Sequence, residues 1–196
     1  MNTNENANLY LIAGLGNPGP EYRRNRHNVG FMLLDRMAER LGLNFSRFES
    51  NALIAKGEYQ GKRLILAKPR TYMNLSGQAV GALLRYYKVP LANLMVAYDD
   101  VDLPLGTLRL RPTGGSAGQK GMMSIIERLG TQDFPRLRIG IGRPPGRMDA
   151  ADYVLQDFSA AELEFLTPTL ERAVDAVLTF LSEGLDAAMN KYNANG

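Results

Sequence analysis

LYLIAGLGNPGPEYRRNRHNVGFMLLDRMAERLG, residues 9–42, contains an apolar run, a polar loop and a segment with helical spacing, in that order. The run Leu9–Ala13 has the length of a buried strand and stops at the Gly- and Pro-rich segment 14–20. From Val29 to Leu41 apolar residues recur with the period of a helix, which Gly42 is placed to end. The stretch therefore predicts a strand, a loop and a helix.

The rest of the chain repeats this alternation. Apolar patterning predicts further strands at Leu53–Tyr59, Arg63–Ala67, Leu94–Ala97, Gly106–Leu110 and Leu137–Ile141. It predicts helices at Ser76–Tyr87, after the glycine-rich loop Gly114–Gly121 as far as Gly130, and at Ser159–Ser182, where Ser159 and Glu162 form a capping box. We expect one α/β domain over residues 1–196, a sandwich with a mixed, mostly parallel central sheet flanked by helices. Residues 1–8 are polar, and we expect them to be flexible.

Composition excludes several kinds of chemistry. The 196 residues include no cysteine and one histidine, which rules out disulfides, cysteine nucleophiles and zinc sites built from several histidines. The absence of cysteine fits a reducing cytoplasm. The net charge of +3 makes the protein mildly basic. We find no apolar leader and no segment near the roughly 20 apolar residues of a membrane helix.

Gly14, Gly16 and Gly19 form a G-x-G-x-x-G pattern directly after the first strand. In dinucleotide-binding proteins the helix starts at these glycines, so that its amide groups meet a pyrophosphate. Here the helical period begins only near Val29, about ten residues later. This spacing favours a glycine-rich turn at the strand end over a nucleotide site.

The only histidine, His27, could be a surface or packing residue, but it lies in a polar loop just before a predicted helix, where catalytic groups are often found. Asp99, Asp100 and Asp102 follow a buried strand, so one of them could orient the imidazole. The same carboxylates could instead hold Mg²⁺ or form a solvated turn. A second polar loop contains Asn74, whose amide can grip a peptide group or cap the next helix.

Basic residues gather between positions 109 and 147, with few acidic ones among them. This asymmetry is typical of a surface that binds phosphate, although a solvated basic face would look the same.

Taken together, these segments resemble the bacterial peptidyl-tRNA hydrolase family. The resemblance rests on GLGNPGPEYRRNRHNVGF, KPRTYMNLSGQAV, YDDVDLPLGTLRLR and the region through LRIGIGRP, and it runs from about Leu9 to Tyr192. It implies a metal-free and cofactor-free α/β enzyme, a cytoplasmic monomer without a membrane association. Such an enzyme cuts the ester bond between a peptide and the 3′ ribose of its tRNA.

The resemblance also implies roles for individual residues. His27 falls on the catalytic histidine and Asp99 on its partner. Peptidyl-tRNA contacts fall on Asn17, Tyr22 and Asn74, and contacts with tRNA phosphates fall on Arg109, Arg111 and Arg138. We also expect Tyr72 and Lys120 to bind the substrate.

One position departs from the family pattern. The glycine-rich loop usually ends in His-Asn-Gly, whereas this chain has Gln119, Lys120 and Gly121. Lysine can only donate hydrogen bonds, so the role of the asparagine cannot simply be transferred. This departure leaves open a catalytically silent RNA-binding relative, of the kind that acts in intron splicing in plant chloroplasts. A nucleotide-cofactor enzyme is a second alternative, which the late start of the helix after the glycines disfavours.

Overall fold

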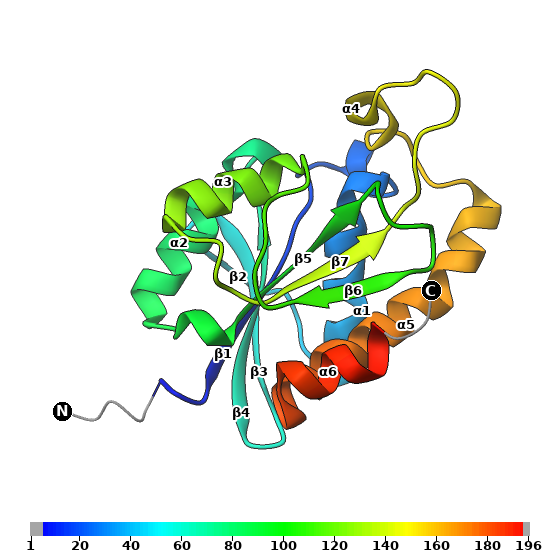
Figure 1. The fold of residues 1–196 in the computed structure, drawn as a ribbon. Helices are drawn as coiled ribbons and strands as arrows, with labels where there is room; N and C mark the ends of the chain where they lie inside the picture. The colour runs from blue at the N-terminus through cyan, green and yellow to red at the C-terminus, as the bar shows by residue number, and fades with distance from the viewer. Residues whose placement is uncertain (1–5, 194–196) are drawn as a thin grey trace.

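A computed structural model describes residues 6–193, in which seven strands form one sheet (Figure 1). The strands lie in the order β2 (Arg47–Glu49), β3 (Ala52–Tyr59), β4 (Lys62–Pro69), β1 (Leu9–Gly14), β5 (Leu94–Asp100), β7 (Arg136–Gly140) and β6 (Leu108–Arg111). Neighbours are parallel from β4 through β1 and β5 to β7, and the remaining pairs are antiparallel. The predicted mixed sheet with a parallel centre is confirmed.

Helices cover both faces of this sheet. One side carries α1 (Val29–Leu41), α5 (Ala160–Glu183) and α6 (Leu185–Tyr192), and the other carries α2 (Ser76–Tyr87) and α3 (Lys120–Leu129) (Figure 1). A short α4 (Ala150–Tyr153) follows β7, and single 3₁₀ turns occur at Pro20–Tyr22, Arg26–Asn28, Met73–Leu75 and Leu91–Asn93. The capping box predicted from Ser159 and Glu162 is present at the start of α5. Within residues 6–193, no helix combines the length and apolar character needed to cross a bilayer.

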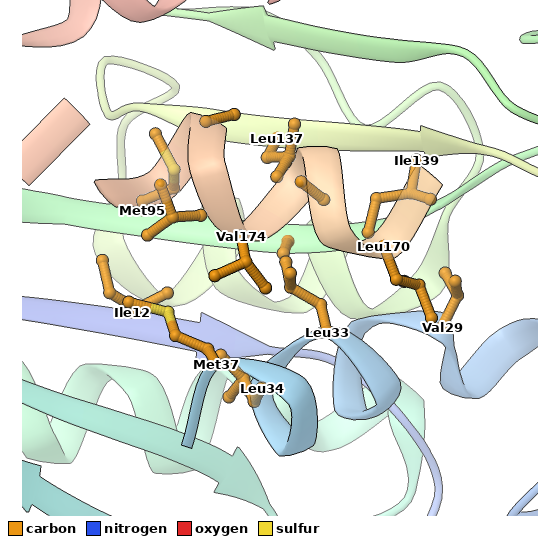
Figure 2. Close-up of a cluster of buried hydrophobic side chains, with 14 of the residues drawn as sticks. Ile12, Val29, Leu33, Leu34, Met37, Met95, Leu137, Ile139, Leu170 and Val174 are labelled. Carbon is orange, nitrogen blue, oxygen red and sulfur yellow. The ribbon is translucent and has the colours of Figure 1, made fainter. Parts of the chain in front are cut away.

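Two apolar cores lie between the sheet and its helices. Side chains of α1 and α5, among them Leu33, Met37 and Val174, pack on one face, as Figure 2 shows. Val80 and Ile125, from α2 and α3, pack on the other face. Because both faces are covered, the central strands read as continuous apolar runs rather than as alternating ones.

The chain order places a crevice at one edge of the sheet. After β1 the chain builds β4 on one side, and after β4 it crosses to build β5 on the other side of β1. The carboxyl ends of β1 and β5 therefore meet where ligands bind in open α/β sheets. The first turn of helix α1 packs closely against Gly14 at this point. A Cβ on Gly14 would lie 2.3 Å from the carbonyl oxygen of Gly30, so only glycine fits there.

Several local features differ from the sequence predictions. Strand β2 and helices α4 and α6 were not expected, and α3 begins at Lys120, inside the predicted loop. Of the residues predicted to be flexible, 1–5 lie outside the described part of the chain. Asn8 is held, since its side-chain amide donates to the Gly61 carbonyl.

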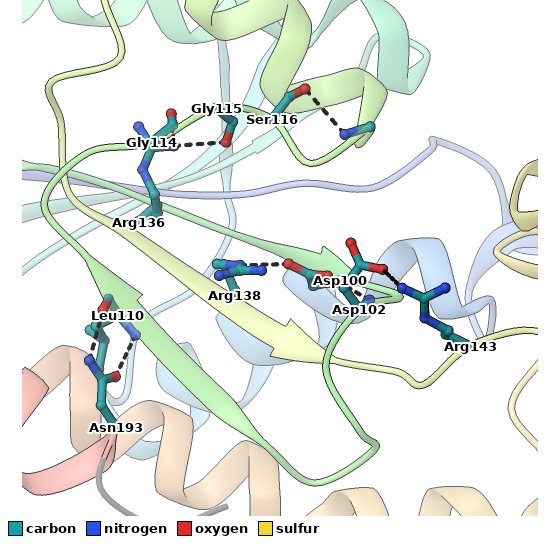
Figure 3. A network of polar contacts seen from close by, with 11 residues as sticks. Asp100, Asp102, Leu110, Gly114, Gly115, Ser116, Arg136, Arg138, Arg143 and Asn193 are labelled. Carbon is teal, nitrogen blue, oxygen red and sulfur yellow. Dashed lines mark hydrogen bonds and ion pairs between the residues drawn. The ribbon is translucent and has the colours of Figure 1, made fainter.

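The edge strand β6 is closed off by a side chain. The Leu110 amide donates to Asn193 Oδ1 at 2.7 Å, and Asn193 Nδ2 donates back to the Leu110 carbonyl at 2.9 Å (Figure 3). Asn193 thus occupies backbone groups that an exposed edge would offer to another strand.

Candidate active site

A cavity of about 870 Å³ opens at the carboxyl ends of β1 and β5. Its lining brings together seven of the ten site residues predicted from the sequence: Asn17, Tyr22, His27, Tyr72, Asn74, Asp99 and Lys120. These residues come from four separate segments, so the fold brings together residues that lie up to 103 positions apart in the sequence (from Asn17 to Lys120). The cavity is therefore the candidate active site.

His27 and Asp99 form a buried pair in the wall of this cavity. Nδ1 of His27 lies 2.8 Å from Oδ2 of Asp99, and the two side chains are only 9% and 2% exposed. The His27 backbone amide donates to the Val154 carbonyl at 2.9 Å, which fixes the turn that carries the ring. With an ionised carboxylate at Nδ1, the neutral ring carries its proton there and keeps a lone pair on Nε2. The expected contact between ring and carboxylate is thus present.

Asn17 is held in one orientation by its neighbours. Its backbone amide donates to Asn28 Oδ1 at 2.9 Å, and Asn28 Nδ2 donates to the Asn17 carbonyl at 3.0 Å. The side-chain oxygen of Asn17 accepts from the Met73 amide at 2.8 Å. Because that oxygen is occupied, the amide Nδ2 is left as a donor for a ligand in the cavity.

Gln119 is a buried site residue whose role the sequence did not indicate. Its Nε2 donates to Asp99 Oδ1 at 3.0 Å and lies 3.3 Å from Met73 Sδ. Its Oε1 accepts from the Met122 amide at 2.8 Å and so caps helix α3. Glycine at position 121 allows this close approach, because the Cβ of any other residue would lie 2.6 Å from Met73 Sδ. The sequence offered no clear signal for this role, because glutamine is not among the residues preferred at an N-cap.

Lys120 follows Gln119 in sequence but lies in a different environment. Its side chain is exposed at the cavity, whereas Gln119 is buried against Asp99. The two residues therefore lie in different places: Gln119 contacts the Asp99 carboxylate, and Lys120 is exposed at the cavity.

The cavity rim is apolar as well as polar. Asn74 and Tyr72 are exposed there, and Tyr22 is half-buried. Met123 and Leu155 also line the cavity and are exposed large apolar side chains. A ligand with both hydrogen-bonding and apolar parts fits such a lining.

Arg26, next to His27, ties the active-site turn to the segment around α4. Its guanidinium donates to Glu162 at 2.8 Å and to the Asp157 carbonyl at 2.9 Å, and it lies 4.2 Å from the centre of the Tyr153 ring. Burial alone would raise the pKa of Glu162, but hydrogen bonds from Ser159 and Arg26 outweigh it and hold this pKa below its ordinary value. The carboxylate therefore stabilises the fold at neutral pH, and this stabilisation is lost only as the pH falls through the lowered pKa.

None of the three predicted phosphate-binding arginines lines the cavity. Arg109 and Arg138 are direct partners in the β6–β7 pair, and alternation along β6 puts Arg111 on the same face. Arg138 is paired with Asp100, a cavity residue, at 2.6 Å (Figure 3). Nε of Arg109 is buried without a hydrogen-bond partner among the described residues.

A fourth arginine on this face supports the glycine-rich loop. Arg136 is 1% exposed and donates to the carbonyl of Gly114 at 2.6 Å (Figure 3). It also donates to the carbonyl of Gln132 at 2.6 Å. Its burial lowers its pKa from the ordinary arginine value. Arg136 is therefore a structural residue that fixes the loop leading to Gln119.

Each of the three aspartates considered as a magnesium site has a protein side chain as its partner. Asp99 contacts His27 and Gln119, Asp100 binds Arg138, and Asp102 binds Arg143 at 2.9 Å. Residues 6–193 contain no group of three or more His, Asp or Glu side chains placed to hold a metal ion. The glycines of the G-x-G-x-x-G pattern also do not open a helix, since α1 begins at Val29.

Comparison with known proteins agrees with this arrangement. The sequence model of the peptidyl-tRNA hydrolase family matches residues 11–196. A peptidyl-tRNA hydrolase of Chloroflexus aurantiacus is 54% identical over 186 residues, covering 94% of this chain and 99% of that protein. The chloroplastic peptidyl-tRNA hydrolase of Arabidopsis thaliana is 49% identical over 185 residues, covering 94% of this chain and 64% of that protein.

A solved structure gives the same result for the fold. The crystal structure of peptidyl-tRNA hydrolase from Acinetobacter baumannii superimposes with a TM-score of 0.90 at 32% identity, and the match covers 96% of each chain. Together with the sequence matches, this likeness means that the chain belongs to the peptidyl-tRNA hydrolase family.

Proposed function

We propose that this protein hydrolyses the ester bond that joins a peptide to the 3′ ribose of tRNA, releasing the peptide and a tRNA with a free hydroxyl. One observation carries the proposal: His27 lines an 870 Å³ cavity while Asp99 occupies its Nδ1. The ring nitrogen that remains, Nε2, is then available to take a proton from water. The reaction is a cytoplasmic one and is carried out by a single chain.

In the proposed mechanism a single imidazole takes up one proton and later releases it. His27 Nε2 removes a proton from water, and the resulting hydroxide attacks the ester carbonyl. The tetrahedral intermediate collapses as its carbon–oxygen bond to the ribose breaks, and the imidazolium returns the proton to the departing ribose oxygen. Asp99 stabilises the imidazolium between these steps without itself being protonated.

The asparagines and tyrosines bind the two halves of the substrate. Asn17 Nδ2 is the donor left free by the contact of its oxygen with Met73, which suits the charge that develops on the carbonyl oxygen. Asn74, exposed at the rim, binds the peptide backbone, and Lys120 donates to the ligand from the start of α3. The rings of Tyr22 and Tyr72 contact the 3′ end of the tRNA, because bases stack well on aromatic side chains.

The arginine face next to the cavity binds the phosphates of the acceptor stem. Like charges placed directly opposite each other in a sheet reduce stability, and Arg109 and Arg138 are such a pair. Asp100 neutralises one of these charges, so a net positive charge remains on the face. The phosphates of a tRNA acceptor stem bound next to the cavity would neutralise this charge.

The test is hydrolysis of purified N-acetyl-aminoacyl-tRNA, with EDTA present throughout. We expect multiple turnovers that release intact tRNA and are unaffected by the chelator. An RNA-binding relative without activity would bind the same tRNA and leave the ester intact, and a nucleotide-cofactor enzyme would bind a free dinucleotide instead. Either result would contradict the proposal.

Removing the positive charges should flatten the salt dependence of tRNA binding. We expect Arg109→Ala and Arg111→Ala each to lower the slope of log K against log salt by about 0.9 for each phosphate that is no longer neutralised. Arg138→Ala should have a smaller effect, because Asp100 already neutralises its charge. Arg47→Ala is the matched control, since that exposed arginine lies on the opposite edge strand of the sheet. Filter binding at several salt concentrations measures the slope, and equal slopes for all four variants would place the phosphate site elsewhere.

A further inference from the structure

We infer that Gln119 is a positioning residue for the hydrolytic reaction: its amide holds the second oxygen of Asp99 and so aims the first oxygen at His27. The inference rests on the proposed function. It assigns to Gln119 a contact with the catalytic pair and no contact with the substrate.

The two oxygens of the Asp99 carboxylate have one partner each. Oδ2 accepts from His27 Nδ1 at 2.8 Å, and Oδ1 accepts from Gln119 Nε2 at 3.0 Å. The carboxylate is 2% exposed, so water does not substitute easily for either donor. A buried carboxylate that loses one of two donors keeps its charge at a cost and is free to rotate about its last bond. Rotation would break the alignment with the ring.

The Gln119 amide cannot turn around, because all of its groups are engaged. Oε1 accepts from the Met122 amide at 2.8 Å, and Nε2 reaches both Asp99 and the sulfur of Met73. The cap contact with a backbone N–H fixes which end of the amide is oxygen. The nitrogen therefore always faces Asp99, and Gln119 presents a donor there at every pH.

This arrangement couples the catalytic pair to the glycine-rich loop. Gln119 ends that loop and begins α3, and the buried Arg136 fixes the loop's start through the Gly114 carbonyl. Because Gln119 is the N-cap of α3 and contacts Asp99, the positive N-terminal end of this helix lies near the carboxylate. Loop, helix and carboxylate thus form one rigid support behind His27.

Three variants separate the positioning role from the cap. Gln119→Ala removes both the donor and the cap, whereas Gln119→Glu keeps an acceptor for Met122 and replaces the donor with a carboxylate. Ser159→Ala is the matched control, because it removes the side-chain cap of α5 away from Asp99. We expect both Gln119 variants to lower kcat about 10–100-fold with KM within about 3-fold of wild type, and Ser159→Ala to change neither.

A spectroscopic readout makes the test independent of turnover. The chain has a single histidine, so untagged protein labelled with ¹⁵N-histidine reports on His27 alone. We expect wild type to show one neutral tautomer with a protected Nδ1 proton, and Gln119→Ala to show faster exchange of that proton or a mixture of tautomers. Failure of wild type to hydrolyse peptidyl-tRNA would contradict the proposed function, whereas the Nδ1 signal tests Gln119 in either case. An unchanged Nδ1 signal in Gln119→Ala, a wild-type kcat in Gln119→Glu, or a loss confined to KM would overturn the inference.

Discussion

Replacing His27 with alanine should lower kcat for peptidyl-tRNA by about 10²–10⁴-fold, the usual contribution of a positioned general base. No second imidazole exists in the sequence, and the ring lies in the cavity wall with Nδ1 occupied by Asp99. Affinity for tRNA should stay nearly unchanged, because the arginine face is a separate surface. Single-turnover hydrolysis and filter binding measure the two effects independently.

The alanine variant has a structural side effect that a second variant removes. Without the ring, the buried Asp99 loses one of its two donors, which destabilises its charge. His27→Asn supplies an amide donor toward the carboxylate but no base, so it should be as inactive as the alanine variant and melt closer to wild type. A variant of either kind that retains most of the activity would show that His27 is not the base.

Most of the fold could be predicted from the sequence, because the apolar residues of the long helices and strands recur with a clear period. It missed β2 and α4, which contain three and four residues and are too short to show a period. Helix α6 was also missed, although Gly184, with a backbone φ of 96°, interrupts the helical region just after the predicted end of α5. Such short elements are set by packing against the rest of the molecule.

Site residues could be predicted where they lie at the carboxyl end of a strand or in a distinctive polar loop. His27 and Asp99 satisfy this rule, and the carboxyl ends of parallel strands bring them together. Gln119 and Arg26 do not, since their roles depend on contacts with Asp99 and with Glu162, 20 and 136 residues away. The roles assigned to the predicted site residues, including the arginines, remain predictions until variants are measured.

Replacing Asp99 with asparagine should be nearly as damaging as removing the imidazole, although the change is almost isosteric. Gln119 presents only a donor, so the oxygen of the introduced amide should turn toward it. The amide nitrogen then faces His27 Nδ1 and forces the ring proton onto Nε2, the position that must accept a proton from water. In a serine protease triad the corresponding change lowers kcat about 10⁴-fold for this reason. We expect a loss of about 10²–10⁴-fold, with the tautomer switch visible in the ¹⁵N spectrum of the single histidine.

A second substitution should then restore part of the activity. In the double variant Asp99→Asn/Gln119→Glu, the carboxylate at position 119 is an acceptor, so the introduced amide should turn its nitrogen toward it. Its oxygen then faces His27 Nδ1 and returns the ring to the productive tautomer with a lone pair on Nε2. We expect the double variant to be at least about 10-fold more active than Asp99→Asn alone, although Gln119→Glu by itself lowers activity. Gln119→Glu would then lower activity in the wild type but raise it in Asp99→Asn, and this change of sign directly measures the coupling between the two residues. A double variant no faster than Asp99→Asn, with its ring proton still on Nε2, would mean that the orientation of the group at position 99 is not controlled by Gln119.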